Sequence, residues 1–390
     1  MKNIHGSFGP VIYFHVPKLK SFKEGVAMCN KNILYLTRTM GLGGTEKVIL
    51  QLCEGLKDDF NKIVVASRGG LHEDVLNKSG ITHYKISDFE NKNPIVILKT
   101  IIELIKIIKS EDIDIVHSHH RMGTFYTNIV AKLIKVKVVH TAHNTFNDKK
   151  IFTKLALKNV EIIAVGEKVK ENLVDFYKIK NSNIKVIYNG IKQEKNTCPK
   201  AIEELLTLKQ NGFYIVGNIG RLSKQKGMEY FIKSIPQIIE KEHKIRFVIV
   251  GDGELREELE CLTKKINIED SIIFLGYRDD IINVINHLDL VVLSSLWEGL
   301  PLTPIETFMQ GKTIVATDVD GTGEIVENGF NGILINSRSE NEIAEAVLRL
   351  YRNDGMKKQM EKRALETYIN KFTYERFIDQ YRNFYNDLIK

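Results

Sequence analysis

Short apolar runs rich in Val, Ile and Leu alternate with segments of helical period along most of the chain. In the first half these runs occupy 32–38, 62–67, 113–119, 136–143, 161–166 and 184–190, and in the second half 213–220, 246–253, 271–277, 290–295, 312–318 and 332–335. Strands buried on both faces of a parallel sheet have this apolar character, and a helix usually connects each strand to the next. The pattern therefore predicts two doubly wound α/β domains with parallel sheets.

A polar, proline-containing stretch marks the predicted domain boundary. Residues 192–200 are interpreted as a linker between an N-terminal domain over 28–191 and a C-terminal domain over 201–370. Residues 1–27 precede Met28 and the first predicted strand, and are interpreted as a peripheral extension. Residues 1–30 lack the continuous apolar core and the cleavage site of a signal peptide. No apolar run reaches the roughly 18 residues that a membrane-spanning helix needs.

Composition and charge narrow the class of protein. The chain is 43% hydrophobic and 27% charged, as ordinary globular proteins are. Its four cysteines are far apart and match no metal-binding spacing, which favours reduced thiols and a cytoplasmic protein. Residues 1–190 carry 29 basic and 18 acidic side chains, a net charge of +11, whereas the remaining residues carry 27 and 31, a net charge of −4. The basic first half predicts an anionic partner surface such as the inner face of a membrane.

One lysine-rich segment, residues 147–160, concentrates this charge. Four lysines recur there at roughly helical spacing beside four apolar side chains: Lys149, Lys150, Lys154 and Lys158 beside Ile151, Phe152, Leu155 and Leu157. Such a helix can lie on an anionic bilayer as a peripheral contact, or it can be the solvated helix of a basic protein. Both interpretations stay open.

Two carboxylates, Glu298 and Glu306, follow a predicted strand of the second half and flank two prolines. Pro301 and Pro304 exclude a continuous helix between them, so Glu298 is expected in the loop at the carboxyl end of the strand. A helix capped by Thr303 and starting at Pro304 would place Glu306 in its first turn as a capping-box residue. Ligands of open α/β sheets bind at strand carboxyl ends and helix amino ends, so a binding function is the alternative.

Three stretches can hold phosphate groups. Gly43 and Gly44 follow the first predicted strand and open a helix, where backbone amides can approach an anion. Arg221 and Lys226 follow the first strand of the second domain and supply a guanidinium fork and a point charge. The helix amino end near Thr303 is the third. Each has an ordinary alternative, a tight turn or a solvated basic loop, and no dinucleotide or Walker fingerprint is complete.

Histidines gather at the ends of two predicted strands: His117, His119 and His120 at one, His140 and His143 at the other. Strand alternation places His117 and His119 on the same face. No cysteine or repeated carboxylate accompanies them, so we expect no zinc site.

Taken together, six motifs in order resemble family 4 of the nucleotide-sugar glycosyltransferases. They are "GLGGTE" (41–46), "DIVHSHH" (114–120), "VIYNGI" (186–191), "GRLSKQKG" (220–227), "VGDGELREELE" (250–260), and the stretch from "EGLPLTPIETFMQG" (298–311) to "ATDVDGTGEIV" (316–326). The resemblance implies the GT-B fold, in which two Rossmann-like domains face each other across a cleft, with a C-terminal helix over 371–390 that returns to the N-terminal domain. It also implies sugar transfer from a nucleotide diphosphate sugar, with retention at the anomeric carbon and without a metal.

The resemblance further implies site residues. The implied catalytic residues are His119, Glu298, Arg221 and Lys226. The implied donor-binding residues are Gly43, Gly44, Arg221, Lys226, Tyr277, Arg278, Glu298, Gly299, Leu300, Leu302, Thr303 and Glu306. Arg221 and Lys226 would bind the diphosphate, Glu298 the donor sugar and Glu306 the ribose, with the base near the backbone of Tyr277 and Arg278. His143 is an acceptor-side candidate.

For the substrates, the resemblance favours a UDP-sugar donor and a saccharide acceptor in cell-surface polysaccharide or glycoconjugate synthesis, and no nucleic acid. The basic first half and the lysine-rich segment over 147–160 predict that this acceptor is lipid-linked. One departure from the family pattern leaves a metal-binding alternative: Asp318 and Asp320 form an Asp-x-Asp pair, which holds manganese in a different glycosyltransferase fold. A sugar-nucleotide epimerase, a phosphorylase of the same fold and a non-catalytic subunit of a glycosylation complex are the other functional alternatives.

Overall fold

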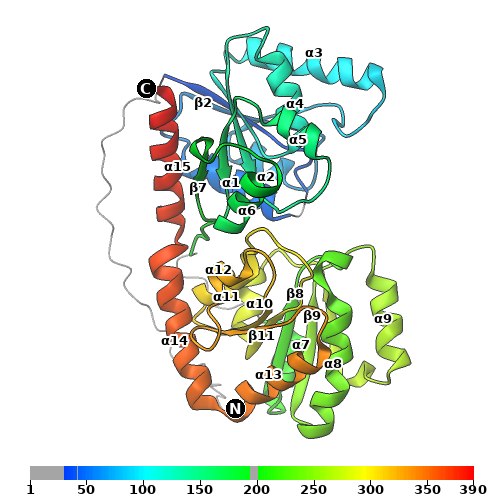
Figure 1. Ribbon diagram of the computed structural model, residues 1–390. Coiled ribbons are helices and arrows are strands. Elements are labelled where there is room, and N and C mark those ends of the chain that lie inside the picture. Colours follow the sequence, from blue (N-terminus) through cyan, green and yellow to red (C-terminus); the bar gives the residue numbers. More distant parts are fainter. Residues whose placement is uncertain (1–29, 42, 194–200) are drawn as a thin grey trace, which may run out of the picture.

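The computed structural model describes residues 30–41, 43–193 and 201–390, which form two α/β domains, one above the other in Figure 1. The predicted extension over 1–27 and all but the first two residues of the predicted linker lie outside the described residues. Each domain contains one parallel sheet flanked by helices. The prediction of two doubly wound parallel domains is confirmed.

The sheet of the N-terminal domain has seven strands among the described residues, in the order β3-β2-β1-β4-β5-β6-β7. Their bounds are β1 Asn32–Leu36, β2 Lys62–Ser67, β3 Thr82–Lys85, β4 Ile115–Ser118, β5 Lys137–Ala142, β6 Glu161–Ala164 and β7 Ile184–Val186. Its helices are α1 Gly44–Gly55, α2 Glu73–Lys78, α3 Pro94–Ser110, α4 Arg121–Val130, α5 Lys150–Ala156 and α6 Glu167–Glu171, followed by a π-helical turn over Asn172–Phe176. β3 was not predicted, because this partly exposed edge strand has no apolar run.

The sheet of the C-terminal domain has six described strands, in the order β10-β9-β8-β11-β12-β13, and all six were predicted. They are β8 Tyr214–Ile219, β9 Ile245–Val250, β10 Ile272–Gly276, β11 Leu290–Leu293, β12 Ile314–Thr317 and β13 Ile333–Ile335. The helices are α7 Glu203–Gln210, α8 Met228–Lys241, α9 Arg256–Lys265, α10 Ile281–His287, α11 Leu302–Met309, α12 Thr322–Ile325 and α13 Glu340–Arg352.

The strand order reverses once in each sheet, and these switch points position the site. In the N-terminal sheet β1 pairs with both β2 and β4, and in the C-terminal sheet β8 pairs with both β9 and β11. The chain segments that leave two such neighbouring strands diverge toward opposite faces of the sheet, which opens a crevice at their carboxyl ends. The segments that follow β1, β4, β8 and β11 carry most of the predicted site residues.

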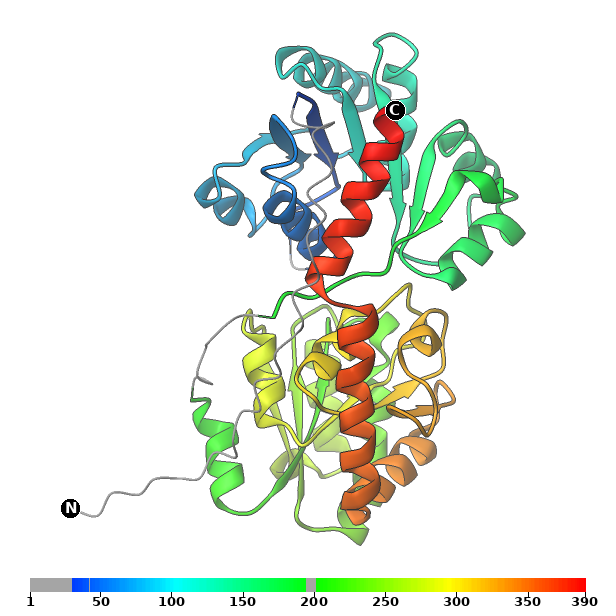
Figure 2. The same cartoon turned by 90° about the vertical axis from the view of Figure 1, so that its left-hand side faces the viewer.

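Two C-terminal helices tie the domains together. α14, Asp354–Lys371, packs on α11 of the C-terminal domain, and α15, Tyr374–Ile389, runs along the N-terminal domain (Figure 2). α15 buries Phe377 and Tyr381 against the N-terminal sheet, and its Arg382 pairs with Asp59 at 2.8 Å. At the crossing, the amide of Ile191 donates to the carbonyl of Phe372 at 3.0 Å.

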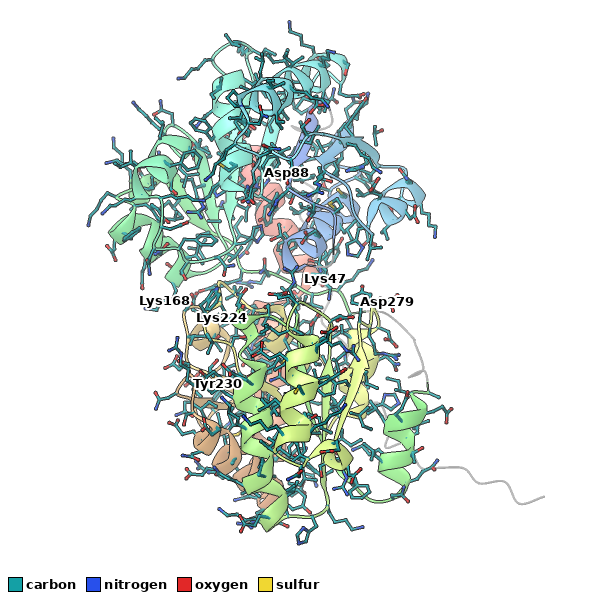
Figure 3. All side chains as sticks on the ribbon, turned by 90° about the vertical axis from the view of Figure 1, so that its right-hand side faces the viewer. Lys47, Asp88, Lys168, Lys224, Tyr230 and Asp279 are labelled. Atoms are coloured by element: carbon teal, nitrogen blue, oxygen red, sulfur yellow. The ribbon has the colours of Figure 1, made fainter. Side chains whose placement is uncertain are left out.

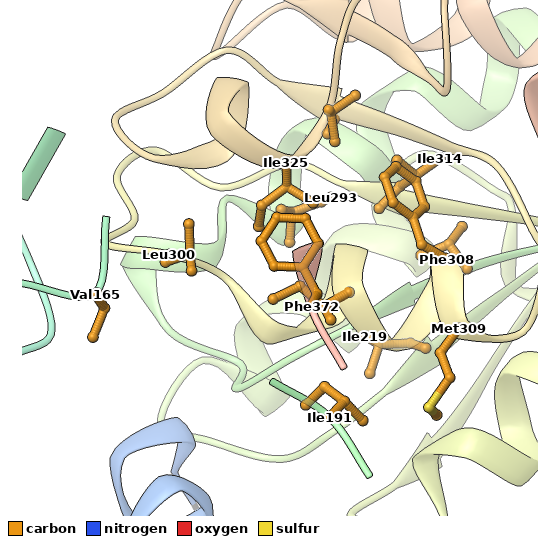
Figure 4. Close-up of a cluster of buried hydrophobic side chains, with 14 of the residues drawn as sticks. Val165, Ile191, Ile219, Leu293, Leu300, Phe308, Met309, Ile314, Ile325 and Phe372 are labelled. Carbon is orange, nitrogen blue, oxygen red and sulfur yellow. The ribbon is translucent and has the colours of Figure 1, made fainter. Parts of the chain in front are cut away.

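An apolar cluster is continuous across the domain junction. Val165 and Ile191 of the N-terminal domain belong to the same buried cluster as Leu293 and Phe308 of the C-terminal domain and Phe372 between α14 and α15 (Figure 4). Apolar burial is the main favourable term in folding, so this cluster stabilises the junction as well as the two domains.

Candidate functional site

The carboxyl ends of the two sheets meet at the domain junction. Figure 3 shows Lys47 and Lys168 on the N-terminal side of this junction and Lys224 and Asp279 on the C-terminal side. Lys47 lies on α1, directly after the glycine turn, and Lys224 lies in the segment after β8. The junction therefore brings together the chain segments in which the sequence analysis expected the site.

Glu298 and Lys226 form an ion pair beside β8 and β11, in which the carboxylate is buried and the lysine is partly exposed. The Nζ of Lys226 donates to Glu298 Oε1 at 2.5 Å, and the hydroxyl of Ser295 donates to the same oxygen at 2.6 Å. The Glu298 side chain is only 6% exposed. Because buried charges are stable only when paired and hydrogen-bonded, these partners fix the carboxylate in one position.

Arg221 has a different environment from Lys226. It is exposed, and among the described residues it forms no ion pair or side-chain hydrogen bond. A guanidinium fork at the carboxyl end of β8 is therefore free to bind an anion, beside the Lys226–Glu298 pair.

The predicted cap of the helix that carries Glu306 is wrong. α11 begins at Leu302, with the extended Pro301 at the cap position and no side-chain cap. Thr303 lies inside the helix, where its carbonyl accepts the hydroxyl of Thr307 at 2.7 Å. Pro304 is tolerated there, because the first helical residues have no intrahelical partner for their amides. Glu306 thus lies beyond the first turn and is not a capping-box residue.

Glu306 instead bonds across the junction. It is buried, and its carboxylate accepts a hydrogen bond from Lys47 Nζ at 3.0 Å. The Glu306 charge raises the pKa of Lys47. Lys47 was not predicted as a site residue, although it lies three residues after Gly44, at the end of α1 that faces the junction.

Several predicted donor-site residues form close contacts between the domains. Gly44 lies so near Leu302 that a Cβ atom on it would be 3.4 Å from the leucine Cδ1, and a Cβ on Gly299 would be 1.8 Å from the carbonyl oxygen of His143. The carbonyl of Leu300 accepts a hydrogen bond from Asn189 Nδ2 at 3.4 Å. Glycine is required at Gly299 because any side chain would separate the two backbones.

The base-site candidates lie apart from this contact, after β10 at the sheet edge. Arg278 pairs with Asp280 through two hydrogen bonds of 2.8 Å, so its guanidinium is occupied. Tyr277 is partly exposed and close enough to Lys47 for the two groups to interact electrostatically. Gly43 is the cap of α1, on the opposite side of the junction.

His119 and His143 are brought together, as strand ends in neighbouring positions allow. The ring nitrogens His119 Nδ1 and His143 Nε2 are 2.9 Å apart, and His119 Nε2 is buried without a hydrogen-bond partner among the described residues. Burial lowers the pKa of His143 to about 4 and that of His119 well below its ordinary value. Both imidazoles are therefore neutral at pH 7, and His119 Nε2 keeps its hydrogen-bonding capacity unused among the described residues.

The other histidines have structural partners. His117 bonds to Tyr385 of α15 at 2.5 Å and to Thr141 at 2.7 Å, and His140 bonds to Thr124 at 2.7 Å. The ring of His117 stacks on that of His119, with centroids 4.5 Å apart. The hydrogen bonds of His117 fix its ring, and this ring packs on one face of His119.

Asp320 of the Asp-x-Asp pair joins the two domains. Asp320 accepts a hydrogen bond from the hydroxyl of Thr145 at 3.0 Å and one from the amide of Glu298 at 2.9 Å, so both of its oxygens are occupied. Asp318 is exposed. In the part of the chain that the structure describes, no three His, Cys, Asp or Glu side chains are grouped so that they could hold a metal ion. The metal-binding alternative for the pair gains no support.

Glu324, which the sequence analysis did not select, forms a further bridge. Its carboxylate accepts hydrogen bonds from the amides of Glu167 and Lys168, at 2.7 and 2.8 Å, at the amino end of α6 in the other domain. A carboxylate at a helix amino end satisfies amides that have no partner within the helix. Gly166, just before α6, leaves the space for it.

Comparisons with known proteins now decide the family. The family described as "Glycosyltransferase Family 4" matches residues 42–195, and "Glycosyl transferases group 1" matches residues 200–367. A curated relative, the UDP-Gal:alpha-D-GlcNAc-diphosphoundecaprenol alpha-1,3-galactosyltransferase of Escherichia coli, is 31% identical over 370 residues, which cover 89% of this chain and 95% of the relative. The chain belongs to family 4 of the glycosyltransferases. It is a retaining glycosyltransferase with a nucleotide-sugar donor, as the resemblance implied.

Solved structures of glycosyltransferases share the fold. Anabaena Alr3699/HepE in complex with UDP-glucose superposes with a TM-score of 0.79 at 19% identity, covering 91% of this chain and 99% of that one. A glycosyltransferase from Rickettsia africae gives a TM-score of 0.80 at 22% identity, covering 93% and 99%. The predicted GT-B fold is therefore confirmed. Among the described residues, no helix is long and apolar enough to cross a membrane.

The buried histidines of this family 4 enzyme predict a pH-dependent stability. Below pH 6.5 the unfolded chain protonates His143, whereas the folded chain keeps it neutral down to a pKa of about 4. The unfolded state then binds more protons, so the free energy of unfolding should fall as the pH falls from about 7 to 5, with up to about 1.4 kcal/mol per pH unit from this histidine. Urea unfolding at several pH values measures this slope.

His143→Gln should make the slope shallower, because glutamine does not titrate. The exposed His243→Gln is the matched control and should keep the parent slope. Equal slopes for the two variants would show that His143 is not buried in its neutral form.

Proposed function

We propose that this enzyme transfers a hexose from a UDP-sugar to a saccharide carried on a lipid diphosphate, in the synthesis of a cell-surface glycan. The name of the Escherichia coli relative describes such a reaction, with UDP-galactose as donor and N-acetylglucosamine on diphosphoundecaprenol as acceptor. The likeness runs through nearly the whole of that relative, which supports the same donor and acceptor classes for this chain.

The observation that carries the donor side of the proposal is the free Arg221 beside the Lys226–Glu298 pair at the switch point of the C-terminal sheet. In the proposed complex, the diphosphate lies between Arg221, Lys226 and the amides of Gly43 and Gly44. Fixed cations and amides stabilise the negative charge that develops on a departing phosphate. The amino end of α11 adds its unpaired amides from the same side.

For the rest of the donor, the proposal follows the family resemblance. Glu306 accepts hydrogen bonds from the ribose hydroxyls, sharing its carboxylate with Lys47. The base lies near the backbone of Tyr277 and Arg278. Glu298, held by Lys226, orients the hydroxyls of the transferred sugar, and Gly299, Leu300, Leu302 and Thr303 form the wall beside it.

The proposed chemistry is a same-face substitution. The bond between the anomeric carbon and the β-phosphate oxygen breaks while the acceptor hydroxyl oxygen bonds to that carbon from the same face. The departing phosphate oxygen takes the proton of the hydroxyl, and UDP leaves. His119 positions a hydroxyl through Nε2, and it is not required as a base, because the departing phosphate oxygen takes the proton. Contact between the domains excludes water from the reacting groups.

A transfer assay tests the proposal. UDP-galactose is incubated with α-N-acetylglucosaminyl diphosphate on a short alkyl chain, in excess EDTA. We expect UDP release that depends on the acceptor, and an α-linked disaccharide product. Sugar inversion without UDP release would indicate an epimerase, dependence on inorganic phosphate a phosphorylase, and no turnover of any UDP-sugar a non-catalytic subunit. Activity lost in EDTA and restored by manganese would return Asp318 and Asp320 as metal ligands.

In the same assay, Arg221→Ala should lower kcat by about 10²–10³-fold while the donor KM changes less, because the guanidinium acts mainly on charge that develops in the transition state. The exposed Lys241→Ala, at the far end of α8, is the matched control and should leave kcat unchanged. A kcat of Arg221→Ala equal to that of the control would contradict the diphosphate assignment.

We also propose that the N-terminal domain contacts an anionic membrane through α5, where a lipid-linked acceptor would reside. Of the four apolar residues in this segment, two are exposed enough to contact a membrane. Leu157 is buried and Phe152 packs on Phe125, whereas Ile151 is 86% and Leu155 55% exposed. Exposed Lys149, Lys150, Lys154 and Lys158 surround the two exposed side chains.

Sedimentation with liposomes measures this contact. Binding to vesicles with anionic lipid should exceed binding to neutral vesicles and fade with salt, since each nearby lysine contributes about 1 kcal/mol and salt screens it. Changing the four lysines of the α5 region to Glu should abolish the preference for anionic vesicles. Changing the exposed Lys241 and Lys264 to Glu should leave that preference in place. Equal binding to anionic and neutral vesicles at low salt would contradict the contact.

A further inference from the structure

A pocket of about 650 Å³ opens between the domains beside the Glu298 loop. The N-terminal domain contributes residues 145–148, after β5, and the C-terminal domain contributes residues 296–297 and 319–320. Phe146 lines the pocket from the first domain and Trp297 from the second, and each is 39% exposed. Two partly exposed aromatic rings from different domains thus border one pocket.

Both aromatic residues have backbones that are held in place by side chains. Asn172 accepts a hydrogen bond from the amide of Phe146 at 3.2 Å and donates one to its carbonyl at 3.1 Å. Gln225 donates to the carbonyl of Trp297 at 3.0 Å. Asn172 begins the π-helical turn, an irregularity that is frequent at functional sites. Exposed rings on fixed backbones are preorganised for a ligand.

One face of the Phe146 ring is already covered. The guanidinium of Arg121 lies 4.1 Å from the ring centroid and is itself fixed by Asp148 at 2.9 Å and by the Tyr177 hydroxyl at 3.2 Å. This stacking holds the ring at a constant angle. With Arg121 over this face, Phe146 is still 39% exposed, and it lines the pocket.

The pocket adjoins the proposed reacting groups. Thr145 and Asp320, both in its lining, bond to each other at 3.0 Å, and Asp320 also accepts the amide of Glu298. Trp297 precedes Glu298 in the chain, and Gly299 touches the carbonyl of His143. A ligand in the pocket would therefore lie next to Glu298.

The charge of the pocket disfavours the anionic donor. Two of its lining residues, Asp148 and Asp320, are acids, and of these only Asp148 is paired with a cation, Arg121. A diphosphate would be repelled by Asp320, whereas an uncharged polyol can donate hydrogen bonds to carboxylates and to the side-chain carbonyl oxygen of Asn147. A pyranose ring has apolar C–H faces and hydroxyls at its rim, which matches aromatic walls with a polar edge.

We propose that this pocket binds the sugar ring of the acceptor, stacked on Phe146 and Trp297, and so determines which acceptor the enzyme uses. The inference rests on the proposed function and adds to it the surface that selects the acceptor. The sugar's hydroxyls bond to Asn147 and Asp148, and its phosphate and lipid extend away from the acidic side chains.

The only tryptophan of the chain, Trp297, reports directly on the pocket. Methyl α-N-acetylglucosaminide, an uncharged acceptor-like probe, is titrated at saturating UDP while tryptophan emission is recorded. We expect a saturable change in emission, with an apparent Kd about tenfold higher in Phe146→Ala than in Phe146→Tyr, because loss of ring stacking corresponds to about this factor. No saturable change in the parent enzyme would overturn the proposal.

Steady-state kinetics of the full-length enzyme give a second test. Phe146→Ala and Trp297→Ala should raise the acceptor KM about tenfold, with the donor KM changed less than about twofold, and Trp297→Phe should recover most of the loss. Phe330→Ala is the matched control, because Phe330 is 37% exposed and stacked by Arg363 but lies outside the pocket. An acceptor KM like that of the control, or an equal rise in donor KM, would overturn the assignment.

Different results would contradict the proposed function and the proposed acceptor pocket. A parent enzyme without any transfer activity would contradict the proposed function, and the fluorescence titration would then decide the pocket alone. A saturable response that Phe146→Ala weakens would support a sugar site in that case, and the absence of a response would refute it.

Discussion

Three carboxylates of the C-terminal domain bond to the N-terminal domain, and the geometry of the site depends on them. Glu306 bonds to Lys47, Asp320 to the hydroxyl of Thr145, and Glu324 to the amides at the amino end of α6. The partners are a cation, a hydroxyl and the backbone amides of a helix terminus. Each of them donates a hydrogen bond to the carboxylate, which stabilises its negative charge. The basic N-terminal half and the acidic C-terminal half of the sequence are consistent with this arrangement.

These bridges explain why the two sheets can share one site. Each sheet alone presents a switch point, but glycine turns, cations and carboxylates meet only where the carboxyl ends of both sheets face each other. The Lys226–Glu298 pair lies on one side and the neutral His119–His143 pair on the other. Asp320 connects the two sides through Thr145 and the amide of Glu298. A group that entered the junction would exchange hydrogen bonds with side chains that are already oriented, which lowers the cost of ordering them.

The features that could be predicted from the sequence are those that depend on residues close together in the chain. Apolar runs identified twelve of the thirteen described strands, and the exception, β3, is an edge strand with the sequence "THYK" and no apolar run. The cap of α11 was misplaced because both Pro301 and Pro304 are compatible with a helix start, and the extended backbone of Pro301 decides it. The bridges of Lys47, Thr145 and Glu324 join residues 259, 175 and 156–157 positions apart, and no local pattern reports such pairs.

The central claim is that Glu306, which Lys47 holds at the junction, binds the nucleotide of the donor. Calorimetric titration of UDP into the parent enzyme and Glu306→Ala tests it most directly, with the exposed Glu327→Ala as the control. Hydrogen bonds to a charged acceptor contribute about 1.5–3 kcal/mol, so the account predicts a Kd that is higher by roughly 10- to 100-fold in Glu306→Ala and unchanged in Glu327→Ala. Equal affinity for UDP in the parent and Glu306→Ala would contradict the account.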